Sequence, residues 1–272
     1  MPAISIIQKQ GFHVRYRPGT ADEEVLNESF EHDLFFPGVP EYRLQPDHII
    51  ADIGAHIGCF SLLAASQLTT GKVYSFEPSA ETYQLLEKNV QTNNLPNIKT
   101  FQLAVAAKAG TTRLYHDKVL GNWGHTITKE VSAESEIVNC ITLGDFIELE
   151  NLEHIDFIKF NCEGAEFGIL LNTAPALLRR VKCMLILYHG YLEETFSEKQ
   201  LAGYLSAAGF KLHRRYRNRE DDSGWLIAYQ AGFAENISIN LRTLPLATSL
   251  FIKELKRKIK RTRQILFEKN NK

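Results

Sequence analysis

The sequence predicts an α/β protein, a Rossmann-like three-layer sandwich in which a mostly parallel sheet lies between two layers of helices. Three observations support this prediction. From about residue 48, short β-rich runs alternate with helical periodicity, which favours strand–helix–strand units. A glycine-containing turn follows the first of these runs, as in folds that bind nucleotide-like ligands at the carboxyl ends of parallel strands. Finally, 272 residues with 44% hydrophobic content can bury the core of one large domain with appendages.

The expected elements follow one another in strand–helix order. The predicted strands are HIIADI (48–53), KVYSFE (72–77), IKTFQLAV (98–105), IDFIKFN (155–161) and CMLILYH (183–189). The predicted helices are FSLLAASQL after the first strand, a helix from Ser79, a short one near 144–150, one from Gly164 and one over 197–208. The hydroxyl of Ser79 is a candidate cap for the helix that it begins.

Two pairs of runs are expected to be antiparallel. TTRLYH (111–116) and EIVNCIT (136–142) flank the loop GNWGHT and predict an inserted or edge pair. GFKLHRRY and WLIAYQ are separated by a polar loop at 217–224. They therefore predict an antiparallel hairpin at the edge of the sheet.

The chain divides into three expected parts. Residues 1–45 have no clear periodicity and are interpreted as an edge or lid segment, and residues 46–232 as the main domain. Residues 233–272 are interpreted as a linker and a basic amphipathic C-terminal helix, because apolar residues recur at helical spacing in SLFIKELKRKIKRTRQILFEK (249–269) among lysines and arginines. With a formal net charge of -1 for the whole chain, the rest must be acidic.

Three interpretations of the basic segment 249–269 remain open: a helix docked on the main domain, a helix bound to an anionic membrane surface, and a contact with nucleic acid or another anionic partner. The sequence shows no apolar run of the roughly 18 residues that a membrane span needs. The four scattered cysteines form no CxxC pair and are expected to be reduced thiols. We therefore expect a cytoplasmic protein, with peripheral binding at the inner membrane face as an option. The oligomeric state is left open.

The run IIADIGAHIGCF places Asp52, Gly54 and Gly58 where the first strand turns into its helix. Glycines there let the backbone turn tightly and approach a ligand. The spacing is DxGxxxG, not the dinucleotide fingerprint GxGxxG, and a carboxylate would repel a pyrophosphate but attract a cation. S-adenosylmethionine carries an ammonium and a sulfonium and no phosphate, so the pattern favours this cofactor.

Glu77 ends the second predicted strand, and an acid at that position can accept hydrogen bonds from both hydroxyls of a ribose. Each acid has a simpler explanation, with Asp52 as a helix cap and Glu77 as a surface acid. Their positions on successive strand ends favour the cofactor-binding interpretation.

Four motifs in order carry a resemblance to a known family: IIADIGAHIG, YSFEPSAETYQLLEKN, FQLAVAAKAGTTRLY and TLGDFIELENLEHIDFIKFNCEGAEFGILL. Over residues 46–190 the chain resembles the FkbM-type family of S-adenosylmethionine-dependent methyltransferases. The resemblance implies the class I methyltransferase fold, with a seven-stranded sheet whose last strand inserts antiparallel, and makes 46–232 the methyltransferase domain. It also implies O-methylation of a hydroxyl on a sugar, glycan or natural product.

By position, the resemblance implies that Asp52, Gly54 and Gly58 hold the methionine part of the cofactor, Glu77 the ribose, and the backbone near 104–105 the adenine. The full expected cofactor-binding set is Asp52, Gly54, Ala55, His56, Gly58, Glu77, Pro78, Ala104, Val105 and Asn161.

Two positions depart from the family pattern. The family usually has Asp where this chain has Asn161, and commonly Glu where it has Tyr188. Both changes are expected to remove a carboxylate from a strand end that faces the pocket. A metal site is not favoured for this reason.

The expected catalytic residues are His189, Glu163 and Asn161. His189 ends a strand, and its ordinary pKa of about 6.5 suits proton acceptance, although it could merely bond a neighbouring loop. Glu163 follows a strand directly and should point into the crevice, whereas Glu166 fits equally well as an acid at a helix N-terminus. Asn161 can orient an acceptor but cannot act as a base. His125, beside Trp123, is a further candidate for the acceptor site, with a structural loop favoured.

The expected partner is a small-molecule or carbohydrate acceptor. The alternatives are a methyltransferase directed to RNA or to an amine, and a catalytically inactive scaffold that binds the cofactor. Nucleic acid is not favoured because the main domain is acidic.

Overall fold

The computed structural model of the chain describes residues 3–31, 44–116, 125–193, 195–218, 220 and 222–231. The predicted helix over 249–269 lies outside these residues, and so does Trp123. Within the described ranges, no helix has the length and apolar character that crossing a membrane requires.

Strands and helices alternate as the sequence pattern predicts. The strands are β1 (Ser5–Lys9), β2 (Phe12–Tyr16), β3 (Ile49–Ile53), β4 (Lys72–Phe76), β5 (Ile98–Phe101), β6 (Ala104–Val105), β7 (Gly110–Tyr115), β8 (Ser135–Ile141), β9 (Ile155–Phe160), β10 (Val181–His189), β11 (Phe210–Asn218) and β12 (Ser223–Gln230). The helices are α1 (Asp22–Phe30), α2 (Cys59–Ala65), α3 (Ala80–Thr92), α4 (Leu143–Leu149), α5 (Ala165–Leu171), α6 (Pro175–Leu178) and α7 (Glu198–Ala207), with a 3₁₀ turn, η2 (Gly190–Leu192).

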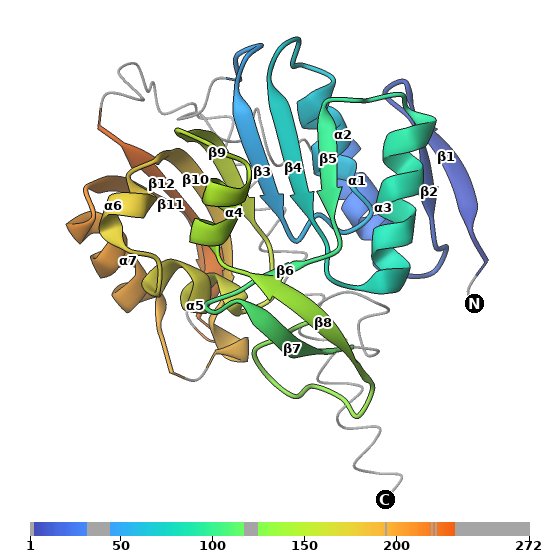
Figure 1. Cartoon of the computed structure of the whole chain (residues 1–272). Coiled ribbons are helices and arrows are strands. Elements are labelled where there is room, and N and C mark those ends of the chain that lie inside the picture. Colours follow the sequence, from blue (N-terminus) through green and yellow to red (C-terminus); the bar gives the residue numbers. More distant parts are fainter. Residues whose placement is uncertain are drawn as a thin grey trace, which may run out of the picture.

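The central sheet has seven strands in the order β11-β12-β10-β9-β3-β4-β5 (Figure 1). The pairs from β10 to β5 are parallel, whereas β12 runs antiparallel to both β10 and β11. The class I methyltransferase fold, with its antiparallel insertion at the edge, is thus confirmed.

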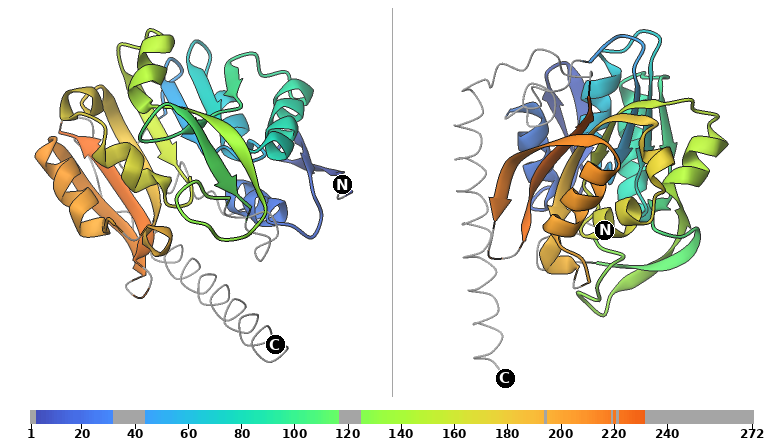
Figure 2. Two further views of the ribbon diagram at one scale, coloured as in Figure 1. Left: turned by 60° about the horizontal axis from the view of Figure 1, so that its bottom comes forward. Right: turned by 90° about the vertical axis from the view of Figure 1, so that its left-hand side faces the viewer.

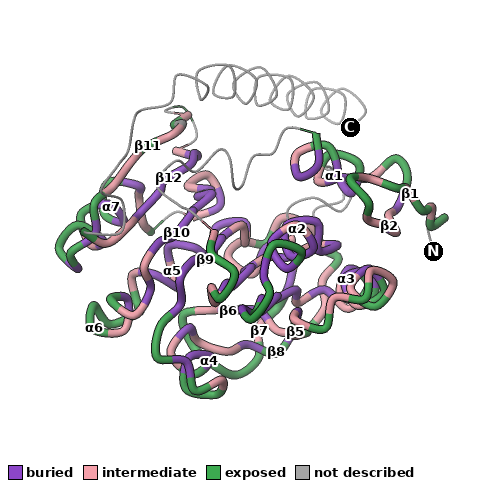
Figure 3. Tube along the Cα trace, turned by 90° about the horizontal axis from the view of Figure 1, so that it is seen from above, coloured by how far each residue is buried: buried purple, intermediate pink, exposed green. Residues whose placement is uncertain are grey.

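Two apolar clusters cover the two faces of this sheet. One cluster joins α4, α5, α6 and α7 to one face, and the other joins β2, α1, α2 and α3 to the opposite face. Side chains alternate between faces along each strand, so Ile50 belongs to the second cluster and Ala51 to the first. In Figure 3 the central strands are largely buried, while α3, α6 and α7 keep exposed outer faces.

A second, three-stranded sheet, β6-β8-β7, contains the predicted inserted pair, with β7 antiparallel to β8. It lies at the carboxyl ends of the parallel strands, in front of them when the molecule is tilted forward (Figure 2). The prediction of one strand over 98–105 was wrong, because the chain leaves the central sheet after Phe101 and pairs with β8 at Ala104 and Val105. This change of sheet brings 103–105 over the strand ends.

Residues 3–31 are more regular than expected. A hairpin, β1–β2, turns at Gln10 and Gly11, both at positive φ, as two-residue hairpin turns require. Its Val14 is fully buried with Leu26 and Phe30 of α1 against α2. An irregular edge or lid was expected here, but β1, β2 and α1 are regular elements that pack on the fold. A second correction concerns Ser79, which is at the N-cap of α3 but makes no capping side-chain bond.

Candidate active site

A pocket of about 750 Å³, its open mouth included, lies at the carboxyl ends of β3, β4 and β9. The residues that line it are Val25, Ile53, Gly54, His56, Phe76, Glu77, Pro78, Leu103, Ala104, Val105, Leu114, His125, Ile127, Asn161, Cys162, Glu163 and Ala165. Seven of the expected cofactor residues are among them: Gly54, His56, Glu77, Pro78, Ala104, Val105 and Asn161.

Gly54 is where two strand ends approach most closely. Its φ is +79°, and a Cβ atom there would lie 2.0 Å from the backbone oxygen of Asn161. The N–H groups of Gly54 and Ala55 both donate to the carbonyl of Phe76, at 3.1 and 2.9 Å. Only glycine fits, and this contact fixes the ends of β3, β4 and β9 relative to one another.

The Asp52 carboxylate does not line the pocket. Asp52 is the register partner of Lys159 across β3 and β9, and both side chains lie on the α2 side of the sheet. Lys159 Nζ lies 2.8 Å from Asp52 Oδ1, and the Ser61 hydroxyl donates to Asp52 Oδ2 at 2.6 Å. We expected the Asp52 carboxylate to contact the cofactor directly. It forms a buried ion pair with Lys159 instead. Ala55 and Gly58 also lie outside the pocket lining.

Lys159 is a residue that the sequence reasoning missed. It is 4% exposed and also donates to the Gly54 carbonyl at 3.0 Å, so it links Asp52 to the glycine loop. The available signal was one lysine inside the apolar run FIKF (157–160). Such a lysine needs a buried partner.

Glu77 occupies the expected place at the end of β4. Its Oε2 accepts from the N–H of His56 and its Oε1 from the N–H of Ser79, each at 3.0 Å. Burial raises the pKa of Glu77 to about 7, against the opposing effect of these two backbone donors. A carboxylate has about four acceptor positions, so two remain for a ligand.

The expected adenine side of the pocket is apolar. Leu103, Ala104 and Val105 line it after the chain has left β5, facing Phe76 at the end of β4. Ile127, from the loop before β8, also lines it. Among the described lining residues, no acid or amide lies in the segment 103–105.

Glu163 points into the pocket from a strained backbone. Its φ is +49°, a value that costs free energy for a residue other than glycine and is common at functional sites. The Thr126 hydroxyl donates to the Glu163 carbonyl at 2.6 Å and holds this conformation. The side chain is buried, and its Oε2 has no hydrogen-bond partner among the described residues. An unpaired buried carboxylate oxygen favours a ligand that donates to it.

Glu166 and His189 lie behind the pocket wall. Glu166 is fully buried and accepts from the N–H groups of Cys162 and Gly164, both at 2.8 Å, so it orders the start of α5. His189 Nδ1 is 3.2 Å from Glu166 Oε1, and its Nε2 is 3.7 Å from Glu163 Oε1. His189 does not line the pocket, but its imidazole bridges the two glutamates.

Two further side chains, those of His125 and Tyr188, differ in whether they reach the pocket. His125 lines the pocket, and burial, with a smaller contribution from His116, lowers its pKa to about 3, so its imidazole is neutral near pH 7. Tyr188 is 1% exposed and packs edge-on against Phe167 of α5, with the ring centroids 6.1 Å apart. The expectation that this strand position faces the pocket was wrong, because alternation along β10 turns Tyr188 toward the helices.

Comparison with known proteins gives one family and several distant relatives. A family model described as methyltransferase FkbM domain matches residues 52–212, more than half of the chain. Methyltransferase 1 of Beauveria bassiana is 24% identical over 143 residues, which are 46% of this chain and 57% of that protein. Hexuronic acid methyltransferase AglP of Haloferax volcanii is 21% identical over 179 residues, 65% of this chain and 70% of that protein.

The chain thus spans little more than half the length of the first of these relatives. Among solved structures, the METTL16 MTase domain is similar with a TM-score of 0.47 and 19% identity, over 81% of this chain and 73% of that one.

Proposed function

Because the chain belongs to the FkbM methyltransferase family, we propose that it transfers a methyl group from S-adenosylmethionine to a hydroxyl oxygen of a neutral small-molecule or carbohydrate acceptor. The observation that carries this proposal is the pocket at the ends of β3, β4 and β9. Glu77, Asn161 and Glu163 line it together with an apolar wall.

The residues of the pocket fit S-adenosylmethionine. Glu77 has two free acceptor positions for a pair of ribose hydroxyls, and the wall at 103–105 suits a flat apolar base. Two carboxylates line the pocket, and neither Lys nor Arg occurs among its described lining residues, which favours a cationic ligand. When bound, S-adenosylmethionine supplies a methyl carbon made electrophilic by the sulfonium.

Asp52 contributes to this site through Lys159. The lysine holds both the Asp52 carboxylate and the Gly54 carbonyl, so the turn that approaches the ligand is fixed before binding. A preformed site lowers the entropy cost of binding.

Asn161 and Glu163 act on the acceptor. The Asn161 amide orients the acceptor hydroxyl by hydrogen bonding, and Glu163 accepts the hydroxyl proton. The acceptor oxygen would take the methyl group as the donor's carbon–sulfur bond breaks and the sulfur leaves as a neutral thioether. His189 is placed to pass that proton away from the pocket, because Glu166 fixes its other ring nitrogen. Holding two reactants in line supplies much of the acceleration in such displacements.

The relatives support the same acceptor class only in part. AglP is named for a hexuronic acid, which carries a carboxylate. In this chain the unpaired Glu163 oxygen would repel an acceptor carboxylate, so a neutral hydroxyl fits better.

The first test is calorimetric titration of the protein with S-adenosylmethionine. We expect binding by the wild type and at least tenfold weaker binding by Glu77→Ala, because each hydrogen bond to a charged group contributes about 1.5–3 kcal/mol. Absence of binding by the wild type would contradict the proposal.

The second test identifies the acceptor. Extracts are incubated with enzyme and methyl-labelled donor, and mass spectrometry detects products that gain one methyl group. Glu163→Gln should lower turnover by about 10²- to 10⁴-fold, the usual contribution of a general base. An amine acceptor is the second candidate, since Asn161 and Glu163 can also accept from N–H, and an N-methyl product would establish it.

A further inference from the structure

A buried ion pair in the N-terminal segment contacts the glycine loop. Arg17 is 1% exposed and Asp22 is fully buried. The Arg17 guanidinium donates from Nε to Oδ2 of Asp22 at 2.9 Å and from Nη2 to Oδ1 at 2.8 Å, and its backbone N–H donates to Oδ2 at 2.7 Å. Both residues precede the region 52–212 that the family model matches.

Asp22 also reaches into the pocket wall. Its Oδ1 lies 3.3 Å from Nε2 of His56, and His56 lines the pocket. The His56 backbone is at φ +54°, and its N–H donates to Glu77. Burial alone would raise the pKa of Asp22, but its bonds to Arg17 and the nearby His56 hold the pKa below its usual value. Asp22 is therefore a buried carboxylate within ion-pair distance of the His56 ring.

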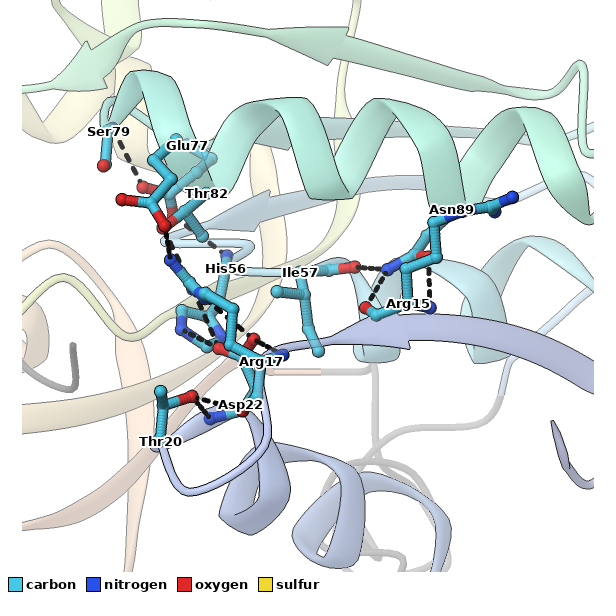
Figure 4. A network of polar contacts seen from close by, with 11 residues as sticks. Arg15, Arg17, Thr20, Asp22, His56, Ile57, Glu77, Ser79, Thr82 and Asn89 are labelled. Carbon is cyan, nitrogen blue, oxygen red and sulfur yellow. Dashed lines mark hydrogen bonds and ion pairs between the residues drawn. The ribbon is translucent and has the colours of Figure 1, made fainter. Parts of the chain in front are cut away.

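Arg17 contacts the first turn of α3, which begins three residues after Glu77. Its Nη2 lies 3.3 Å from the Thr82 hydroxyl and its Nη1 3.4 Å from Glu81 Oε1. Both partners are in the first turn of α3, directly after the segment in which Ser79 donates to Glu77. Figure 4 shows the Arg17 side chain running from Asp22 toward Thr82 and passing His56, with Glu77 joined to His56.

The same segment supplies part of the pocket surface, because Val25 of α1 lines it. A charged pair loses its hydration on burial, and this cost is large unless the site supplies good partners. Here the partners are the loop and the helix start that bracket Glu77.

We propose that Arg17 and Asp22 are positioning residues of the methyl-donor site, and that they hold His56 and the start of α3 so that Glu77 stays aimed at the donor ribose. The inference rests on the proposed function. It makes the N-terminal segment a part of the donor site that the family match does not include.

The test compares three variants by calorimetry with S-adenosylmethionine and by steady-state kinetics. Asp22→Asn keeps the shape but removes the charge that holds both Arg17 and His56. His56→Asn removes the ring contact with Asp22, keeps the N–H that donates to Glu77, and suits a positive φ. Arg15→Ala is the control, because Arg15 joins β2 to Thr92 at the far end of α3 and contacts neither His56 nor the first turn.

We expect Asp22→Asn and His56→Asn to weaken donor binding about tenfold and to raise the donor KM. The acceptor KM should stay the same, and Arg15→Ala should bind donor as the wild type does. Amide hydrogen exchange gives a readout of coupling: donor should slow exchange in α1 of the wild type and do so less in His56→Asn.

Each outcome separates the two claims. Failure of the wild type to bind donor overturns the proposed function itself. Donor binding by the wild type together with unchanged affinity in both positioning variants overturns this inference alone. If Asp22→Asn does not fold, the donor affinity and hydrogen exchange of His56→Asn test the inference. An equal loss of donor affinity in Arg15→Ala would overturn it, because the effect would then reflect general stability.

Discussion

At the scale of single residues, the direction of a side chain decides what an acid at a strand end can do. Asp52 lies near the end of β3 and Glu77 directly follows the neighbouring β4, but Asp52 turns toward α2 and Lys159, whereas Glu77 faces the pocket. The alternation of side chains along a strand fixes this difference. Sequence position alone placed both acids at the site, and only Glu77 lines it.

The ionisation of Glu77 leads to a pH prediction. Its folded-state pKa is raised to about 7 from an ordinary value of 4.5, so the native state binds a proton more tightly than the unfolded state. Its contribution to stability is present below pH 4.5 and is lost as the pH rises through 7. Donor affinity should change the opposite way, because the ionised form accepts better from ribose hydroxyls.

The measurement follows both quantities from pH 5 to 8. We expect donor affinity to rise toward pH 8 while the free energy of unfolding of the ligand-free protein falls, and Glu77→Gln to remove both trends. The exposed Glu148→Gln serves as control and should retain them. A wild-type donor affinity independent of pH would show that Glu77 does not meet the donor.

Tyr188 leads to a stability prediction. Its hydroxyl is buried without a hydrogen-bond partner among the described residues, and burial raises its pKa above the ordinary range. An unpaired buried hydroxyl costs free energy, so Tyr188→Phe should leave the free energy of unfolding unchanged or raise it by about 1 kcal/mol. Urea denaturation measures this, and turnover should not change. A loss of stability or of turnover would give the hydroxyl a role.

At the scale of elements, the local sequence pattern predicted most strands, but it did not predict contacts between distant segments. The strands β3, β4, β9 and β10 and the edge hairpin β11–β12 were predicted within a few residues, because continuous apolar runs indicate buried parallel strands. The split of 98–105 was not predictable, since the apolar pattern continues while the chain changes sheets. The contact of Asp22 with His56 depends on packing between segments far apart in the chain, which no periodicity encodes.

The pairing of β3 with β9 leads to a prediction on the buried ion pair. Lys159→Met leaves the Asp52 carboxylate buried and unpaired, and removing one partner of such a pair typically costs about 3–5 kcal/mol. The double variant Asp52→Asn/Lys159→Met should recover a part of this loss, because no charge is then left uncompensated. Denaturant unfolding of both variants measures the coupling.

The pair of Lys99 with Glu150 provides the control, because its lysine is half-exposed although the Glu150 side chain is mostly buried. Water can hydrate the exposed end of such a pair, so Lys99→Met should cost less than Lys159→Met. Equal effects of Lys99→Met and Lys159→Met would mean that burial does not make the inner pair important for stability.

At the scale of the whole molecule, the charges around the pocket are sorted by sign. Lys159 and Arg17 lie behind it and are paired with Asp52 and Asp22, while Glu77 and Glu163 face its interior. The cationic groups are thus committed to buried partners, and the described lining presents negative charge. This arrangement attracts a cationic donor, and it applies equally to whatever acceptor enters beside it.

Acceptor charge is the property that this sorting should control. We expect a neutral hexose glycoside to be methylated at least about tenfold more efficiently, in kcat/KM, than the corresponding hexuronate, since like charges brought together cost several kcal/mol. The discrimination should shrink at high salt and in Glu163→Gln, compared by the ratio of the two acceptors because this variant lowers turnover for both. Glu148→Gln, with its charge on the exposed surface of α4, should keep the wild-type ratio. Preference for the hexuronate would mean that cationic groups outside the described lining reach the acceptor and outweigh Glu163.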